Sequence, residues 1–245
     1  MAQAFETDGG FGTLARLGLI VLSTDESLEN EARLVLGDRA VSMMHTRIPA
    51  EEDVTPDALR MMENRLPEAA RLLPQGQDAI GYGCTSASTV IGPERVAELV
   101  RGHHPGAQVS NPISAVIAAL RALEVGRIAY VSPYVPSVTA PMRVYLEKQG
   151  ITTVIEDSFA EGDDRTVAHI SEKSSKTMIL DVIAKAKVEA VFVSCTNLRT
   201  FGIIDEVERE TGLPVVSSNQ ALLWHMLRLA GVDARGWGPG RLFSL

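Results

Sequence analysis

Short apolar runs alternate with longer amphipathic stretches along nearly the whole chain. Each apolar run has the length of a buried strand, and each interval is long enough for a helix. The expected strands are Arg16–Leu22, Ala40–Thr46, Ala79–Gly83, Ala107–Ser110, Arg127–Ser132, Thr152–Glu156, Ala190–Ser194 and Pro214–Ser217. Strands and helices that alternate in this way predict an α/β fold with parallel, doubly wound sheets.

Helix signals fill the intervals between these strands. Thr55 and Pro56 form a good helix start, because the threonine hydroxyl caps the helix and proline suits its first position. Residues 1–15 are expected to form an arm outside the fold. The expected helices are Leu28–Leu36, Pro56–Leu73, Pro93–Arg101, Ile113–Leu123, Pro136–Gln149, Thr166–Lys187, Ile203–Glu210 and Asn219–Ala230.

The two cysteines of the chain follow two similar strands. Cys84 ends the run AIGYGC and precedes Thr85, and Cys195 ends AVFVSC and precedes Thr196. Other short motifs also recur in the same order in both halves, which predicts two similar Rossmann-like or flavodoxin-like units related by pseudo-two-fold symmetry. Ligands of open α/β sheets bind at the carboxyl ends of strands. We therefore expect both thiols on opposite walls of one cleft between the units.

Composition excludes several classes of function. The chain has 245 residues, is 45% hydrophobic and carries a net charge of -8, so a nucleic-acid partner is not expected. It lacks an apolar run of the roughly 20 residues that span a membrane, and its N-terminus does not resemble a signal peptide. We expect a cytoplasmic protein with reduced cysteines, no membrane partner and no metal site, because the five histidines form no cluster with the cysteines.

Two thiols on opposite faces of a substrate permit three reactions. They can exchange an α-proton in a racemisation, add to a double bond in a cis–trans isomerisation, or protonate the product of a decarboxylation. Each reaction builds negative charge beside a carboxylate, so hydrogen-bond donors are expected nearby. The candidate donors are Thr85, Ser86, Thr196 and Asn197, although a cap or turn role is an equal alternative for each hydroxyl.

Several motifs together resemble the Asp/Glu racemase superfamily. They are the two Cys-Thr strand ends, the turn STDES at 23–27, Ser132-Pro133-Tyr134, LPVVSS at 213–218 and GPGRLF at 238–243. From Arg16 to the C-terminus the chain is most similar to the branch of maleate cis–trans isomerases and arylmalonate decarboxylases, which includes relatives like ectoine-utilisation protein A.

The resemblance implies a role for individual residues. Cys84 would be the nucleophile, Cys195 the acid/base, and Tyr134 a ligand of the substrate carboxylate. It also implies a homo-oligomer that acts on a small carboxylate or dicarboxylate without a cofactor. In this branch the last helix of the second half crosses back, so we expect one domain of residues 1–112 plus 218–245 and another of residues 113–217.

One position departs from the isomerases and leaves the substrate open. The isomerases carry asparagine in the turn after the first strand, and Asp25 aligns there. A carboxylate at this place disfavours a second anionic group, but it suits an ammonium group or the orientation of a thiol. The first expectation is the isomerisation of maleate to fumarate. The alternatives are a two-base racemase of amino or hydroxy acids, a malonate-type decarboxylase, and a ligand-binding protein without activity. Asp163, Asp164 and Arg165 align weakly with a polar substrate-binding loop of the isomerases, where Arg165 could pair with a carboxylate, but a solvated charge run is the first expectation.

Overall fold

The computed structural model describes residues 2–245, and its strands form two four-stranded parallel sheets. The first sheet has the order β2-β1-β3-β4, and the second has the order β6-β5-β7-β8. The strands of the first are β1 (Ala15–Leu22), β2 (Val41–Ile48), β3 (Ala79–Gly83) and β4 (Gln108–Ser110). Those of the second are β5 (Arg127–Ser132), β6 (Thr152–Ser158), β7 (Ala190–Val193) and β8 (Val215–Ser217).

Helices connect the parallel strands. In the first half they are α1 (Leu28–Leu36), α2 (Pro56–Arg71), α3 (Thr85–Ile91), α4 (Pro93–Arg101) and α5 (Pro112–Ala122). In the second half they are α6 (Pro136–Lys148), α7 (Asp164–His169), α8 (Glu172–Ile183), α9 (Phe201–Thr211) and α10 (Ser218–Leu229), followed by a short 3-10 helix at Arg241–Ser244.

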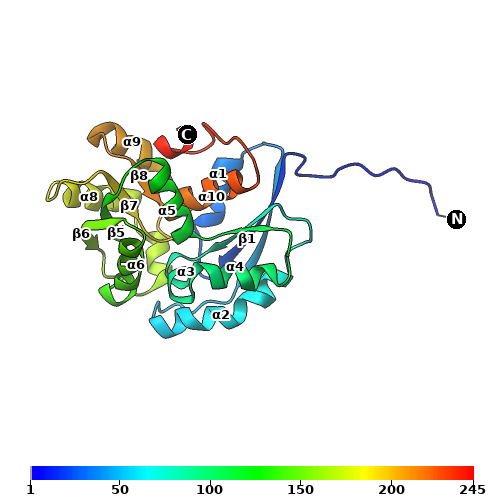
Figure 1. The fold of residues 1–245 in the computed structure, drawn as a ribbon, viewed down its shortest axis with the longest axis horizontal. Helices are drawn as coiled ribbons and strands as arrows, with labels where there is room; N and C mark the ends of the chain where they lie inside the picture. The colour runs from blue at the N-terminus through cyan, green and yellow to red at the C-terminus, as the bar shows by residue number, and fades with distance from the viewer. Residues whose placement is uncertain (1) are drawn as a thin grey trace.

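The two halves repeat one arrangement. When β1 is matched with β5, the remaining strands of the two sheets correspond in chain order and in spatial order. Figure 1 shows the sheets in two lobes, with β1 in one and β5, β7 and β8 in the other. The expected α/β fold with two similar parallel-sheet units is confirmed.

The last helix of each half packs at the junction of the lobes. Helix α10 contacts α5 and β3, and α5 also contacts β8. The chain therefore returns to the first sheet after β8. The domain boundaries at residues 112 and 217 stay a prediction.

Local sequence explains why the elements begin where they do. The N–H of Ala58 donates to Thr55 Oγ1 at 3.2 Å, as the predicted cap of α2 requires. One face of strand β3 is tightly packed, because a Cβ at Gly81 would overlap Met226 and a Cβ at Gly83, on the same face, would overlap Leu28. The glycines thus let α1 and α10 approach the strand that delivers Cys84.

One prediction about helices is wrong, and one helix was not predicted. The single helix expected at Thr166–Lys187 is two helices, since Ile170 is extended and the Ser171 hydroxyl caps a new helix by accepting from Ser174 N–H. The hydroxyl-rich stretch after Cys84, for which no helix was expected, is helix α3. Residues 2–14 form no helix or strand and extend away from the lobes (Figure 1); Met1, part of the expected arm, lies outside the described residues.

Candidate active site

Both cysteines lie at the carboxyl ends of equivalent strands. Cys84 follows β3 directly and is the N-cap of α3, where the Ala87 N–H points at its sulfur, 3.4 Å away. Cys195 follows β7 after one residue, and the Asn197 N–H donates to its sulfur at 3.2 Å. Both side chains are buried. Each thiol therefore faces a backbone donor from the turn that follows its strand.

A serine that sequence reasoning missed links the two strand ends. The Cys195 N–H donates to Ser218 Oγ at 3.1 Å, and the Thr85 hydroxyl donates to the same oxygen at 2.8 Å. Cys195 has a φ of 143°, a region that residues other than glycine rarely adopt. The bond to Ser218 helps to hold this backbone, and it ties the turn of Cys84 to that of Cys195.

A buried chain of donors and acceptors begins at the Cys195 thiol. The Tyr134 oxygen lies 3.1 Å from Cys195 Sγ, and the same hydroxyl donates to Asp164 Oδ1 at 2.7 Å. A phenol carries one hydrogen, so the thiol is the donor in the sulfur contact when the phenol hydrogen points at Asp164. The Thr24 hydroxyl donates to Asp164 Oδ2 at 2.6 Å. Cys195, Tyr134 and Asp164 thus form a path along which a proton can move.

Burial keeps both thiols protonated in this arrangement. It raises the pKa of Cys84 to about 12 and the pKa of Cys195 well above the ordinary value. The charges of Asp164 and Asp25 raise both pKa values further, while the backbone donors oppose the shift. A thiol reacts as a nucleophile only as the thiolate. The reaction therefore needs a base that takes the thiol proton as the sulfur attacks.

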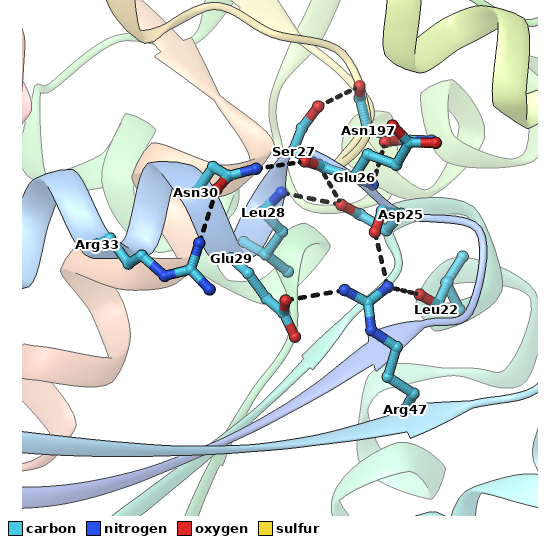
Figure 2. A network of polar contacts seen from close by, with 10 residues as sticks. All are labelled: Leu22, Asp25, Glu26, Ser27, Leu28, Glu29, Asn30, Arg33, Arg47 and Asn197. Atoms are coloured by element: carbon cyan, nitrogen blue, oxygen red, sulfur yellow. Dashed lines mark hydrogen bonds and ion pairs between the residues drawn. The ribbon is translucent and has the colours of Figure 1, made fainter.

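Asp25 lies in the turn after β1, and its two carboxylate oxygens have different surroundings (Figure 2). Oδ1 accepts from Ser27 N–H at 2.9 Å and from Leu28 N–H at 2.8 Å, so it caps the start of α1. Within the described residues, Oδ2 has no hydrogen-bond partner. Burial raises the pKa of Asp25 to about 7. A carboxyl group with this pKa is suited to accept a proton at neutral pH.

Asn197 joins loops from both halves of the chain. Its Oδ1 accepts from Glu26 N–H at 2.8 Å, as Figure 2 shows, and its Nδ2 donates to the carbonyl oxygens of Asp164 at 2.9 Å and Thr24 at 3.2 Å. The Ser27 hydroxyl donates to the Asn197 carbonyl at 2.8 Å. These bonds use both amide hydrogens, so its geometry is that of a positioning residue. Its predicted contact with substrate stays a prediction.

The other predicted donors divide between the pocket and the scaffold. Ser86 and Tyr134 line the same pocket as Cys84 and Asp164. The Thr196 hydroxyl instead donates to the Gly83 carbonyl at 3.3 Å, and the Thr85 hydroxyl is engaged by Ser218. Both threonines lie beside the cysteines and bond across the two halves. Their roles toward a substrate stay predictions.

The pocket beside Cys84 is nearly closed. Its volume is about 30 Å³, and a single water molecule needs roughly 10–15 Å³ of such space, so the pocket has room for a few water molecules. The segment between β2 and α2 covers it, held by the bonds Val54 N–H to Gly162 O at 3.1 Å and Asp164 N–H to Glu52 O at 3.0 Å. We expect this cover to move when a substrate enters.

The sequence did not identify Asp164 as a residue of the site. Asp163 caps α7 and Arg165 pairs with the exposed Glu52, as a solvated charge run predicts. Asp164 between them is only 2% exposed and lines the pocket. Nothing in the local sequence separates it from its charged neighbours, because its burial comes from contacts with Thr24 and Tyr134.

Known proteins share the whole of this fold. Residues 17–243 match the family described as arylmalonate decarboxylase. The chain belongs to this family. An arylmalonate decarboxylase from Bordetella bronchiseptica is 31% identical over 205 residues, covering 78% of this chain and 82% of the relative. A maleate isomerase from Nocardia farcinica (strain IFM 10152) is 28% identical over 245 residues, covering 94% and 95%.

One of the similar solved structures contains a covalently modified cysteine. A cysteine-to-serine mutant of the Nocardia farcinica maleate cis–trans isomerase, with a covalently bound succinylcysteine intermediate, has a TM-score of 0.82 and is 26% identical. The alignment covers 94% of this chain and 98% of that one. The predicted branch is confirmed, and so is the prediction that this family member is an enzyme.

The helices bear on whether the protein crosses a membrane. Among residues 2–245, none of the helices has both the length and the apolar character needed to cross a membrane. The cytoplasmic location, the homo-oligomer and the absence of a nucleic-acid partner stay predictions.

Proposed function

We propose that the protein is a cofactor-independent cis–trans isomerase of a small unsaturated carboxylic acid, with maleate as the reference substrate. The observation that carries the proposal is the pair of buried thiols at equivalent strand ends, one of them bonded to Tyr134. The maleate isomerases among the relatives and the succinylcysteine intermediate of one of them support it.

The proposed reaction starts with Cys84. Its sulfur adds to one carbon of the cis double bond while its proton passes to a buried carboxylate, for which Asp25 is the candidate. Addition leaves a single bond between the two central carbons and negative charge on the neighbouring carboxylate. The hydroxyls of Ser86 and Tyr134, both in the pocket, are the candidate donors to that charge, and Tyr134 donates to it when its single hydrogen turns from Asp164 to the substrate.

Rotation and elimination complete the cycle. Cys195 can give its proton to the adjacent carbon, which yields a saturated adduct on Cys84, and later take that proton back. The bond between the central carbons rotates while it is single. Release of the Cys84 sulfur from the substrate then restores the double bond in the trans form, and the proton held by Asp25 returns to Cys84. No atom is gained or lost.

Proton NMR of maleate in deuterated water tests the proposal. We expect the maleate signal to convert to that of fumarate, and we expect Cys84→Ser and Cys195→Ser to abolish the conversion. Ser174→Ala, on the exposed side of α8, is a matched control and should convert maleate normally. The proposal fails if wild-type protein converts no cis acid, or if the Cys84→Ser variant remains active.

One observation favours a second candidate, a two-base racemase. The free Oδ2 of buried Asp25 can accept a hydrogen bond from an ammonium group next to a reacting Cα. In that reaction one thiolate takes the α-proton and the other thiol delivers one to the opposite face. Deuterium appearing at Cα of aspartate, glutamate or hydroxyaspartate, with loss of optical activity, would move the assignment to this reaction.

A further inference from the structure

The pocket beside Cys84 is lined by acidic groups and lacks basic ones. Glu51, Asp53 and Asp164 contribute to its wall, and none of its described lining residues is lysine, arginine or histidine. Glu51 is paired with Arg65, at 2.8 Å. Asp164 receives only hydroxyl donors at its carboxylate oxygens, from Tyr134 and Thr24. The charge that faces Cys84 is therefore negative.

The nearest arginine to the Asp25 turn is already engaged. Arg47 donates to the carbonyl oxygens of Leu22 at 2.9 Å and Asp25 at 2.7 Å, and it pairs with Glu29 at 2.8 Å. Figure 2 shows its guanidinium group on the backbone side of the turn. It holds the turn in place and leaves the Asp25 carboxyl group without a cationic partner.

Asp25 adds a buried acceptor: the Thr196 hydroxyl lies beside its carboxyl group, but the single hydrogen of that hydroxyl points at the Gly83 carbonyl and leaves Oδ2 without a donor. Asp25 is 1% exposed, and its Oδ2 has no hydrogen-bond partner among the described residues. The residues that follow Asp25 bond to Asn197, whose N–H donates to Cys195 Sγ at 3.2 Å, so the turn of Asp25 lies beside that of Cys195. The charges of Asp25 and Asp164 both raise the pKa values of the two thiols. A buried acceptor without a donor is unfavourable, and a ligand that supplies the donor gains the difference.

A dicarboxylate fits these surroundings poorly. One carboxylate can take the hydroxyl donors of Ser86 and Tyr134, but a second would meet Asp25 and Asp164 with no cation to compensate. Like charges brought together in a water-poor site repel strongly. A group that carries N–H donors is attracted instead of repelled, because each of its hydrogens can bond to a carboxylate oxygen of the protein.

We propose that the natural substrate is a monoanion with one carboxylate and, at its other end, a nitrogen group that donates hydrogen bonds to Asp25 and Asp164. This inference rests on the proposed function, because it names the substrate class of the same site. A carboxamide is such a group, because it supplies N–H donors and leaves the single charge of the carboxylate unchanged. Maleamate carries this group and differs from maleate only by a carboxamide in place of one carboxylate.

The test compares kcat/KM for maleamate and maleate by proton NMR. We expect wild-type protein to favour maleamate by about 100-fold, since the site accepts its N–H groups and repels the second charge of maleate. Asp25→Asn keeps the Oδ1 that caps α1 and replaces Oδ2 by a donor, so it should shift the ratio toward maleate by at least about 10-fold. Asp57→Asn removes an equal charge from an exposed side chain and should leave the ratio unchanged.

Binding to the Cys84→Ser variant gives a second readout that does not require turnover. Isothermal titration with maleamate and maleate should show tighter binding of maleamate. If neither cis acid is isomerised but maleamate still binds more tightly than maleate, the cis–trans function fails and the nitrogen-donor inference holds.

Three results would overturn the inference. Maleate used or bound as well as maleamate would show that the acidic groups do not select the second group of the substrate. An unchanged ratio in Asp25→Asn would remove Asp25 from that selection. Failure of maleamate to bind the Cys84→Ser variant would contradict the substrate class itself.

Discussion

The Tyr134 hydroxyl is the contact on which the acid/base role of Cys195 depends. Tyr134→Phe removes this hydroxyl and preserves the ring, which is 6% exposed and packed in the core. The bonds lost are the 2.7 Å bond to Asp164 and the 3.1 Å contact with Cys195. Both partners remain buried, and Asp164 keeps the Thr24 hydroxyl as its side-chain donor.

The structure sets the size of the effect. A buried hydrogen bond to a charged group is worth about 1.5–3 kcal/mol, so Tyr134→Phe should lower the free energy of unfolding by about 2 kcal/mol. Loss of the proton path from Cys195 should lower kcat by about 100-fold, the lower end of what a positioned acid or base contributes. Neither the loss of stability nor the loss of kcat is expected from packing alone, because phenylalanine packs as the tyrosine ring does.

Urea denaturation and steady-state turnover measure the two effects separately. Tyr145→Phe is the matched control, since Tyr145 lies on α6 and is partly exposed outside the pocket. It should change neither stability nor kcat. A Tyr134→Phe enzyme with wild-type kcat would refute the proton path, even if its stability fell.

Two further predictions concern the scaffold. Gly83→Ala should lower the free energy of unfolding by about 1–3 kcal/mol in urea denaturation, because its Cβ would overlap Leu28, whereas Gly106→Ala should be neutral because that Cβ would meet no atom. Burial raises the pKa of Glu31 from 4.5 to about 7, so the folded state holds a proton that the unfolded state releases, and stability should fall as pH rises from about 5 to 7. The contribution of Glu31 to this fall should be at most about 3 kcal/mol, at about 1.4 kcal/mol per pH unit. Urea denaturation at several pH values should show a smaller fall in Glu31→Gln than in the wild type. A flat wild-type profile would contradict the cause given for the pKa shift.

Much of the fold follows from the sequence because its signals are local. The strands that precede Cys84 and Cys195 are short apolar runs, and Thr55-Pro56 marks the start of α2 as expected. Parallel sheets follow from the alternation of such runs with helices. The matching Cys-Thr pairs likewise predicted that both thiols lie at equivalent strand ends.

Features that depend on tertiary contacts were not predictable in the same way. Helix α3 consists mainly of Thr, Ser and Ala, and hydroxyl residues have weak helix propensity; its fold depends on burial and on the cap at Cys84. Asp164 and Ser218 acquire their places in the site from partners more than 20 residues away. Such partners leave no pattern in the neighbouring sequence.

The central claim is that Cys84 forms the covalent bond and Cys195 moves the proton. Peptide mass spectrometry of the Cys195→Ser variant, incubated with maleamate and separately with maleate, tests it most directly. Trypsin separates the two positions, since Cys84 lies in Leu72–Arg95 and position 195 in Val188–Arg199. We predict that the added mass of one substrate molecule appears on Cys84, because in this variant water slowly protonates the adjacent carbon and no thiol removes that proton again. The added mass should be absent in a Cys84→Ser, Cys195→Ser double variant. Modification of neither peptide with either acid, in a protein whose wild-type form isomerises that acid, would contradict the account.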